Sequence, residues 1–514
     1  MQGKKQYQEK LFANFQLSDR VPKENFYRKL SEVLDLHFLY KLTEPYYGYC
    51  GQKSIDPIVF FRLSLVGYLE NITSDRKLID HCSMRMDILF FLGYDIDEPL
   101  PWHSTISRTR QLFTEGLFEK VFSEVLSMCV DKDMVAGHTQ VIDAAPVKAN
   151  ASMDSLELKV PKEELNEHIR KIHESNEEDA PRRKSKEDKS TDAQRTLTAT
   201  EADINAIKNR NENWRSKSVG RPGGNNKGAK YTSNKTHYSP TDPDARISVK
   251  PGKARKLNYL SQMSVDSANH VITHIGAEYA DQKDSQHLQN IVLRLRNRLH
   301  SKGLIMENIL ADAGYSSGEN YAFFEQQNLR SYIPPHGQYK GGPKGFTYHK
   351  DGDYWECSES KQVKYQKTFL DKGVKKNRYT TKRADCKGCP IKTACLGKGH
   401  EKRIDITYYK AEYDRGIARL KTRQGRRFKY IRSSTVEPVF GSLTQFFGMR
   451  KVNTIGIEQA NKVMLMAGAA YNLKKYLKYV QKRANSKAGV AKTSMTNIFT
   501  RIMMNMMRHK PSLF

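Results

Sequence analysis

The sequence predicts an α/β protein in which a mixed sheet carries helices on its faces. Apolar residues recur at three- and four-residue spacing over residues 22–135, as they do in amphipathic helices. Short β-rich segments then alternate with helical ones between residues 136 and 336, and helical patterns return after residue 421. The order strand, hairpin, helix, strand, helix, strand matches a ribonuclease-H-like (retroviral-integrase-like) core, which we therefore expect.

Residues 1–135 are predicted to form a helical N-terminal domain. The segments "FYRKLSEVLDLHFLYKL" and "IVFFRLSLVGYLENI" have helical spacing of apolar residues. In "HSTISRTRQLF", which follows Pro101, Ser104 or Thr105 is a plausible N-cap. Arg108 and Arg110 follow this cap, so the segment is either a recognition helix that contacts DNA or an ordinary capped helix with solvated arginines.

The core is predicted to comprise residues 136–150 and 241–336. "HTQVIDA" reads as a strand that ends near Asp143, and "MENILADAGY" as a buried strand that ends at Asp312. Between them, "NYLSQMSVD" and "HVITHIGAEYA" predict a hairpin, with Asp266 at its turn. An amphipathic helix, "HLQNIVLRLRNRL", follows, and Asp281 lies in its N-cap region.

The remaining segments differ sharply in composition. Residues 151–240 are charged and poor in apolar residues, so we expect a partly helical, partly disordered insertion. Residues 337–420 form a second insertion that contains a cysteine cluster. Residues 421–482 are predicted to be the helical end of the core, and 483–514 a C-terminal tail.

The charge balance favours a phosphate-rich partner. Lys and Arg number 86 against 57 acidic residues, which gives a net charge of +29 in 514 residues. The same excess of positive charge is weaker evidence for binding to an anionic membrane surface. No apolar run approaches the ~18 residues of a spanning helix. The first residues, "MQGKKQYQEK", lack a signal peptide, and seven cysteines do not indicate a disulfide framework. We therefore expect a cytoplasmic protein.

Three acidic residues occupy positions suited to metal binding. Asp143 and Asp312 end strands, and Glu437 is the one acidic residue of Lys421–Lys451, which holds eight Lys and Arg residues. Ligands gather beyond the carboxyl ends of strands in open α/β sheets, and converging carboxylates require cations. The sequence therefore predicts a site for two Mg²⁺ (or Mn²⁺) ions that would clamp a phosphate.

Each acid also has a simpler interpretation. Asp143 could be a turn residue at a strand end, and Asp312 could make local hydrogen bonds in its loop. Glu437 could balance charge, or form a capping box with Ser434 at the start of a helix in which Pro438 occupies the first turn.

Three blocks of the sequence resemble the catalytic blocks of bacterial insertion-sequence DDE transposases. They are "VIDAAPVKANAS", "ILADAGYSSGENYAFFE" and "STVEPVFGSLTQFFGMRKVNTIGIEQANKVMLMAGAAYNLKKY". The similarity is greatest to the branch typed by insertion sequence eleven-eighty-two. The N-terminal region resembles that branch's DNA-binding domain. The resemblance covers about residues 20–480.

The resemblance implies that Asp143, Asp312 and Glu437 are a metal-binding catalytic triad. It also implies a DNA transposase that binds terminal inverted repeats, hydrolyses phosphodiester bonds and joins ends to target DNA. Such a protein would be bacterial and nucleoid-associated, and would act as a homodimer or larger assembly on DNA. The alternatives are a nuclease of this fold without strand transfer, and a non-catalytic DNA-binding protein derived from a transposase.

Basic residues near Glu437 depart from the related Tyr-x2-Arg-x3-Glu-x6-Lys signature. Tyr430 stands at its place, but Arg432 is one residue early and Thr444 stands where Lys is expected. We expect Tyr430, Arg432, Arg450 and Lys451 to contact DNA phosphates.

Four cysteines form a candidate zinc site. Cys357 lies upstream of Cys386, Cys389 and Cys395, and four thiolates can bind tetrahedral Zn²⁺ and stabilise a small insertion. This cluster also resembles one in the same transposase group. Two alternatives are reduced, unliganded cysteines and a site in which His400 replaces Cys357. Cys50, Cys82 and Cys129 lie in or beside apolar patterns and are expected in the core.

Overall fold

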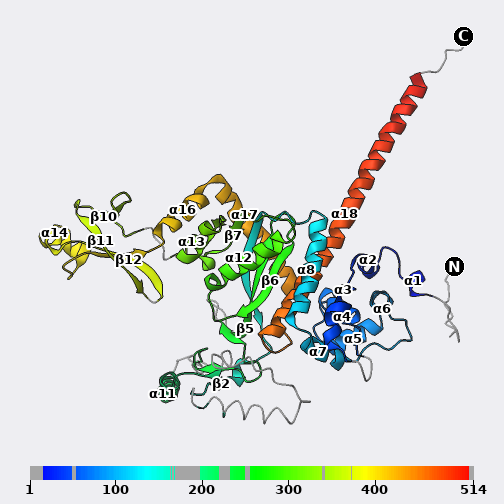
Figure 1. The fold of residues 1–514 in the computed structure, drawn as a ribbon, viewed down its shortest axis with the longest axis horizontal. Coiled ribbons are helices and arrows are strands. Elements are labelled where there is room, and N and C mark those ends of the chain that lie inside the picture. Colours follow the sequence, from blue (N-terminus) through cyan, green and yellow to red (C-terminus); the bar gives the residue numbers. More distant parts are fainter. Residues whose placement is uncertain are drawn as a thin grey trace.

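The structure is a computed structural model of the whole chain (Figure 1). It describes residues 16–48, 54–161, 164, 167, 197–218, 232–248, 255–337, 342–371 and 373–508, with side chains left out at 212–218 and after 483. Cys50 and most of the insertion that we predicted to be partly disordered lie outside these residues. No helix among the described residues is long and apolar enough to cross a membrane.

The N-terminal region is helical, as predicted. Its elements are α1 (Leu17–Arg20), α2 (Phe26–Val33), α3 (Phe38–Thr43), η1 (Glu44–Tyr46), α4 (Pro57–Leu69), α5 (Asp75–Ser83), α6 (Met86–Leu92), α7 (His103–Leu112) and α8 (Glu115–Asp131). The Asp56 side chain caps α4 by accepting the Ile58 and Val59 N–H groups, and Pro57 occupies the first turn. The α7 cap was predicted wrongly: the helix begins at His103 after Trp102, so Ser104 and Thr105 lie inside it.

A mixed six-stranded sheet forms the core. Its strands are β1 (Thr139–Lys148), β4 (Arg246–Ser248), β5 (Lys256–Asp266), β6 (Ile272–Tyr279), β7 (Asn308–Leu310) and β8 (Arg330–Tyr332). β5 pairs antiparallel with β1, and β4 and β6 pair with successive parts of the other edge of β5. β1, β7 and β8 run parallel. The predicted hairpin is therefore confirmed as β5 and β6.

Helices from both halves of the chain cover this sheet. α12 (Asp284–His300), η4 (Ala313–Tyr315) and α13 (Gly318–Gln326) lie between and after its strands, while α17 (Arg423–Phe446) contacts β1, β5, β7 and β8. α18 (Ile457–Arg508) packs on β6 and against α4 and α8 before it projects from the body (Figure 1). This helix continues past residue 483, where we had expected a separate tail. One apolar core joins these helices, the sheet and the N-terminal helices.

The 151–240 insertion is described in part. It contains η2 (Met153–Ser155), β2 (Glu157–Leu158), α11 (Glu201–Ser218) and β3 (His237–Tyr238), with β2 and β3 paired. Its helical component is therefore confirmed.

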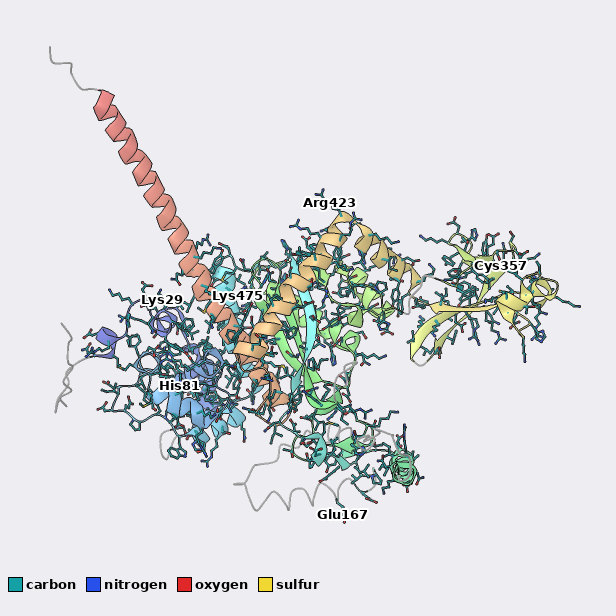
Figure 2. The ribbon with its side chains drawn as sticks, turned by 180° about the vertical axis from the view of Figure 1, so that it is seen from behind. Lys29, His81, Glu167, Cys357, Arg423 and Lys475 are labelled. Carbon is teal, nitrogen blue, oxygen red and sulfur yellow. The ribbon has the colours of Figure 1, made fainter. Side chains whose placement is uncertain are left out.

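The second insertion is a separate β structure at one end of the molecule. It holds β9 (Phe346–His349), β10 (Tyr354–Cys357), β11 (Gln362–Asp371), β12 (Val374–Thr380) and β13 (Arg403–Thr407), with α14 (Arg383–Lys387) and α15 (Lys392–Leu396). The sheet order is β13-β12-β11-β10-β9, and α16 (Lys410–Lys421) leads back to the core. Figure 2 shows Cys357 in this sheet and Arg423 at the apex where α16 meets α17.

Candidate active site

Asp143 and Asp312 lie at corresponding positions on neighbouring parallel strands. Val141 of β1 is in register with Leu310 of β7, and each aspartate follows two residues later. β7 ends two residues before Asp312, but the strand that we expected to end at Asp143 continues to Lys148, so Asp143 lies within β1. The charge of Asp312 acts on Asp143, so the two carboxylates lie near each other. Both have the local partners that a turn residue would have: the Ala144 N–H donates to Asp143 Oδ1 and the Gly314 N–H to Asp312 Oδ1, each at 2.8 Å.

The helix that carries Glu437 begins earlier than predicted. α17 starts at Arg423 with Thr422 as its N-cap, and Thr422 Oγ1 accepts the Gly425 N–H at 3.0 Å. The predicted capping box is wrong, because the Ser434 hydroxyl instead donates to the Ile431 carbonyl within the helix. Pro438 is interior, where it lacks an N–H for the Ser434 carbonyl. The helix therefore lacks one backbone hydrogen bond directly beside Glu437.

Packing of α17 determines where Glu437 lies. Val436, Val439 and Leu443 are at most 1 % exposed and hold the helix on the sheet. The Glu437 side chain is 62 % exposed, on the face that the buried residues do not use. Glu437 therefore faces solvent at the edge of the site.

A guanidinium lies between two of the carboxylates. Arg432 Nη1 is 3.8 Å from Asp143 Oδ2, and Arg432 Nη2 is 3.9 Å from Glu437 Oε1. The Arg432 side chain is 23 % exposed. One cation thus links the strand that carries Asp143 to the helix that carries Glu437, at distances that are longer than hydrogen bonds.

A fourth carboxylate, which the sequence did not single out, belongs to this neighbourhood. Asp284 begins α12, and its Oδ1 accepts from the buried Gln262 side chain at 3.2 Å. A Cβ on Gly314 would lie 3.0 Å from Asp312 Oδ1 and 3.2 Å from Asp284 Oδ2, so these two carboxylates flank the same glycine. We expected Asp281 in the N-cap region of this helix, but the N-cap is Lys283, and Asp281 lies 3.7 Å from Arg246. Nothing in the sequence around Asp284 indicates that it lies near Asp312.

Burial raises the pKa of Asp143 to about 6. The Ala144 N–H and Arg432 act to lower this pKa, whereas the charges of Asp312 and Asp284 act to raise it further. These opposing effects identify Asp143 as the crowded centre of the acidic group.

The possible metal ligands at this site are carboxylate oxygens, which are the ligands that Mg²⁺ prefers. Their oxygen atoms and their negative charge both suit a hard divalent cation. Within the described part of the chain, however, no three His, Cys, Asp or Glu side chains are placed closely enough to hold a metal ion. Arg432 lies near Asp143 and Glu437, and Asp312 and Asp284 flank Gly314, so the four carboxylates are neighbours rather than a closed ligand set.

Several predicted DNA contacts lie along α17 and the turn after it. Tyr430 is 75 % exposed, and Arg450 and Lys451 are also exposed. Lys451 forms a β-bridge with Lys148, and the Val452 N–H donates to the Lys148 carbonyl at 2.8 Å. The turn that carries Arg450 and Lys451 is thereby fixed to the end of the strand that bears Asp143.

The two α7 arginines differ in their surroundings. Arg108 is exposed and able to contact a phosphate. Arg110 instead forms a two-pronged ion pair with Asp75, with contacts of 2.6 and 3.0 Å and a side chain that is 17 % exposed. This pair joins α5 to α7 and gives Arg110 a structural role.

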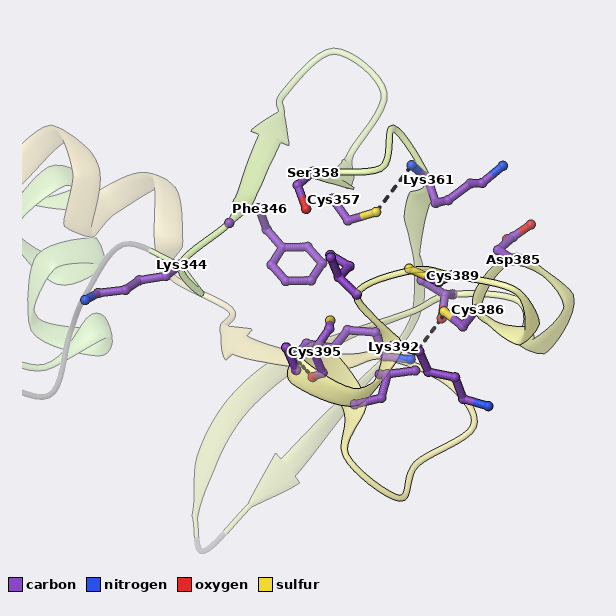
Figure 3. A pocket seen from close by; sticks show the side chains of 16 residues that line it. Lys344, Phe346, Cys357, Ser358, Lys361, Asp385, Cys386, Cys389, Lys392 and Cys395 are labelled. Atoms are coloured by element: carbon purple, nitrogen blue, oxygen red, sulfur yellow. Dashed lines mark hydrogen bonds between the residues drawn. The ribbon is translucent and has the colours of Figure 1, made fainter.

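The four cysteines of the second insertion surround one cavity of about 340 Å³ (Figure 3). Cys357 Sγ accepts the Lys361 N–H at 3.4 Å, and Cys386 Sγ lies 3.2 Å from the Thr381 hydroxyl. Cys389 and Cys395 line the same cavity, whereas His400 does not. The expected core cysteines Cys82 and Cys129 are fully buried, and burial raises the pKa of each thiol to about 12.

Two family matches cover separate parts of the chain. Residues 15–112 match the family described as "Transposase domain (DUF772)", and residues 356–477 match "Transposase DDE domain". No curated protein matches the chain. A solved structure titled "Mos1 transposase paired-end complex with left transposon end" is 12 % identical and covers 61 % of this chain and 73 % of that one, but its TM-score of 0.15 is too low to carry an argument. The two family matches support a DDE-type transposase family for this chain.

Proposed function

We propose that the chain is a DNA transposase of an insertion sequence, with a ribonuclease-H-like core and Asp143, Asp312 and Glu437 as its metal-binding residues. The observation that carries the proposal is the parallel register of β1 and β7, in which Asp143 and Asp312 each follow the paired residues Val141 and Leu310 by two positions. Arg432 extends this group to Glu437 on α17. The two family matches support the reaction class that we propose.

The residues of the chain divide the work between positioning and charge. The exposed basic residues of the first half of α17 (Arg423, Arg426, Arg427 and Lys429), together with Arg450 and Lys451, would hold the phosphate backbone. The carboxylates of Asp143, Asp312 and Glu437 would hold two Mg²⁺ or Mn²⁺ ions, which, when bound, supply charge neutralisation at the scissile phosphate. Asp284 would add negative charge behind Asp143 and Asp312. No covalent intermediate with the protein is needed, because positioning and charge neutralisation suffice.

The proposal is tested with a plasmid that carries the inverted repeats bordering the gene. With Mg²⁺ and a target plasmid, we expect the purified protein to cleave both ends and to join them to the target. With Ca²⁺ in place of Mg²⁺ we expect binding without cleavage, because the larger ion favours a looser, higher coordination. Cleaved ends without joined product would identify a nuclease, and binding alone in Mg²⁺ would identify a non-catalytic DNA-binding protein.

We also propose a structural Zn²⁺ ion for the cysteine cavity. The sheet around it has a core of only four buried apolar residues, Trp355, Val363, Tyr379 and Ile404. So small a core needs a further constraint, and four thiolates around one cavity can supply it. As placed, the cysteines are not yet within joint ligand distance, so metal binding would draw β10, α14 and α15 together.

Metal analysis of the purified chain checks this proposal. We expect about one Zn²⁺ per chain, lost in the double variant Cys386→Ser with Cys389→Ser, because only two of the four thiolates then remain. Cys357→Ser and His400→Ala distinguish the two ligand sets: loss only in the first supports four cysteines, and loss only in the second supports His400. A chain refolded with added Zn²⁺ that retains none would refute the proposal.

A further inference from the structure

The β11–β12 hairpin of the second insertion has an unusual exposure pattern for a sheet. β10 pairs with β11 only at residues 362–364, so from Lys367 to Asp371 β11 pairs with β12 and with no other described strand. Lys364, Tyr365, Lys367, Thr368 and Leu370 are all exposed. A strand that is exposed on both faces and along one edge gains little from packing, and such edges invite an external partner.

The charge of this region is concentrated far above the average of the chain. Residues 361–403 contain fourteen Lys and Arg against three acidic residues, a net charge of +11 in a segment that holds less than a tenth of the sequence. More than a third of the net charge of +29 therefore lies here. A positive charge concentrated in this way in one part of the molecule attracts a polyanion.

Ion pairs neutralise the basic residues of only one part of the hairpin. Arg378 pairs with Asp405 at 2.7 Å, and Lys376 pairs with Asp371 at 2.7 Å. Lys364 and Lys367 form no ion pair with any residue that the structure describes, and Lys375 lies over the Tyr408 ring at 3.8 Å. Lys364 and Lys367 are thus available for phosphates on the outer strand.

Apolar side chains stand at the hairpin tip. Leu370 is 73 % exposed and Val374 is 50 % exposed, on either side of the turn, where Gly373 has φ +80°. Cross-strand pairing sets Leu370 opposite Lys375 and Asp371 opposite Val374, so this apolar pair lies among basic residues. An exposed apolar tip on a basic ribbon fits a partner that offers both phosphates and the apolar edges of bases.

We propose that the β11–β12 hairpin is a DNA-binding arm that enters the major groove of a duplex away from the catalytic carboxylates. A two-stranded ribbon fits the width of that groove, Lys364 and Lys367 would contact backbone phosphates, and Leu370 would contact base edges. Figure 1 shows the sheet that carries the hairpin at one end of the molecule, linked to the core through α16, so the arm binds DNA beyond the cleavage point. This inference rests on the proposed function, because it adds a second DNA-contacting surface to the proposed transposase.

Salt titration of binding to a duplex of about 40 mixed-sequence base pairs tests the phosphate contacts without needing the terminal repeats. Each lost phosphate contact lowers the slope of log K against log salt by about 0.9, so Lys364→Ala with Lys367→Ala should lower it by about 2 between roughly 50 and 200 mM NaCl. The control is Lys478→Ala with Lys482→Ala, which removes the same charge from exposed sites on α18. Equal slopes for the two double variants would overturn the proposal.

Leu370→Ser tests the groove contact separately. Leu370 is exposed, so the variant should fold normally, keep the salt slope and bind the same duplex roughly tenfold more weakly because the apolar contact is lost. A double-stranded RNA of equal length should compete poorly, since its major groove is too deep and narrow for a ribbon. Unchanged affinity in Leu370→Ser, or equal competition by the RNA, would refute a major-groove arm. None of these readouts uses cleavage, so the arm and the transposase activity can fail independently.

Discussion

Glu437→Gln is expected to abolish cleavage of the transposon ends while leaving DNA binding intact. Glutamine keeps the size of the side chain, which is 62 % exposed and packs against little. It removes the negative charge that attracts both a divalent ion and Arg432. Loss of an outer partner of a metal site commonly costs 10–100-fold, so loss of a direct ligand should exceed about 100-fold. Single-turnover cleavage and equilibrium binding, measured on one preparation, separate the two effects.

The control for this prediction is Glu201→Gln, the same change at an exposed position at the start of α11. It should leave cleavage and binding as they are. If Glu437 merely balanced the basic residues around it, Glu437→Gln would bind DNA more tightly and still cleave. That outcome would remove Glu437 from the catalytic group.

The arrangement of Asp143 and Asp312 could be predicted because it depends on local patterns. Apolar runs that lead into an aspartate mark buried strands, and parallel pairing of these runs then sets the two aspartates at matching positions. The end of the first strand was predicted wrongly, because pairing with β5 carries β1 past Asp143 to Lys148. The β5–β6 hairpin was equally accessible, since β-rich segments flank a turn sequence. Asp266 at that turn is fully buried and accepts the Gly137 N–H at 2.8 Å, which agrees with its structural interpretation.

The errors at α17 have a physical cause. Ser434, Glu437 and Pro438 together look like a helix start, because proline is tolerated best in a first turn. Packing of Val436, Val439 and Leu443 on the sheet instead carries the helix through the proline. Tertiary contacts outweigh local preference here, and no pattern within the segment reveals those contacts.

Asp284 and the pairing of Arg110 with Asp75 escaped prediction for a related reason. Both depend on which segments distant in sequence meet in the fold: α12 with η4, and α5 with α7. Arg110 looked like a DNA contact because its partner lies 35 residues away. Asp284 looked like an ordinary acidic residue in a first helical turn. A single sequence that is not aligned with homologues carries no signal for such pairings.

Asp143→Asn is expected to stabilise the folded chain while it abolishes cleavage. Burial, with help from Asp312 and Asp284, raises the pKa of Asp143 to about 6, against an ordinary value of 3.8. Between these values the folded chain holds a proton that the unfolded chain has lost, so stability falls as pH rises from about 4 to about 6. Above pH 6 the ionised carboxylate costs up to about 3 kcal/mol, which asparagine does not incur.

Thermal unfolding in EDTA measures this effect. Near pH 8, Asp143→Asn should raise Tm by roughly a few degrees over the parent chain, and near pH 3 the two should unfold together, because Asp143 is then largely protonated in both states. The control is Asp266→Asn. Asp266 accepts N–H groups from Gly137, Ala268 and the Gln140 side chain, so an amide there would face donors and lower Tm. A Tm for Asp143→Asn that falls near pH 8 would show that the ionised Asp143 stabilises the fold, which contradicts this prediction.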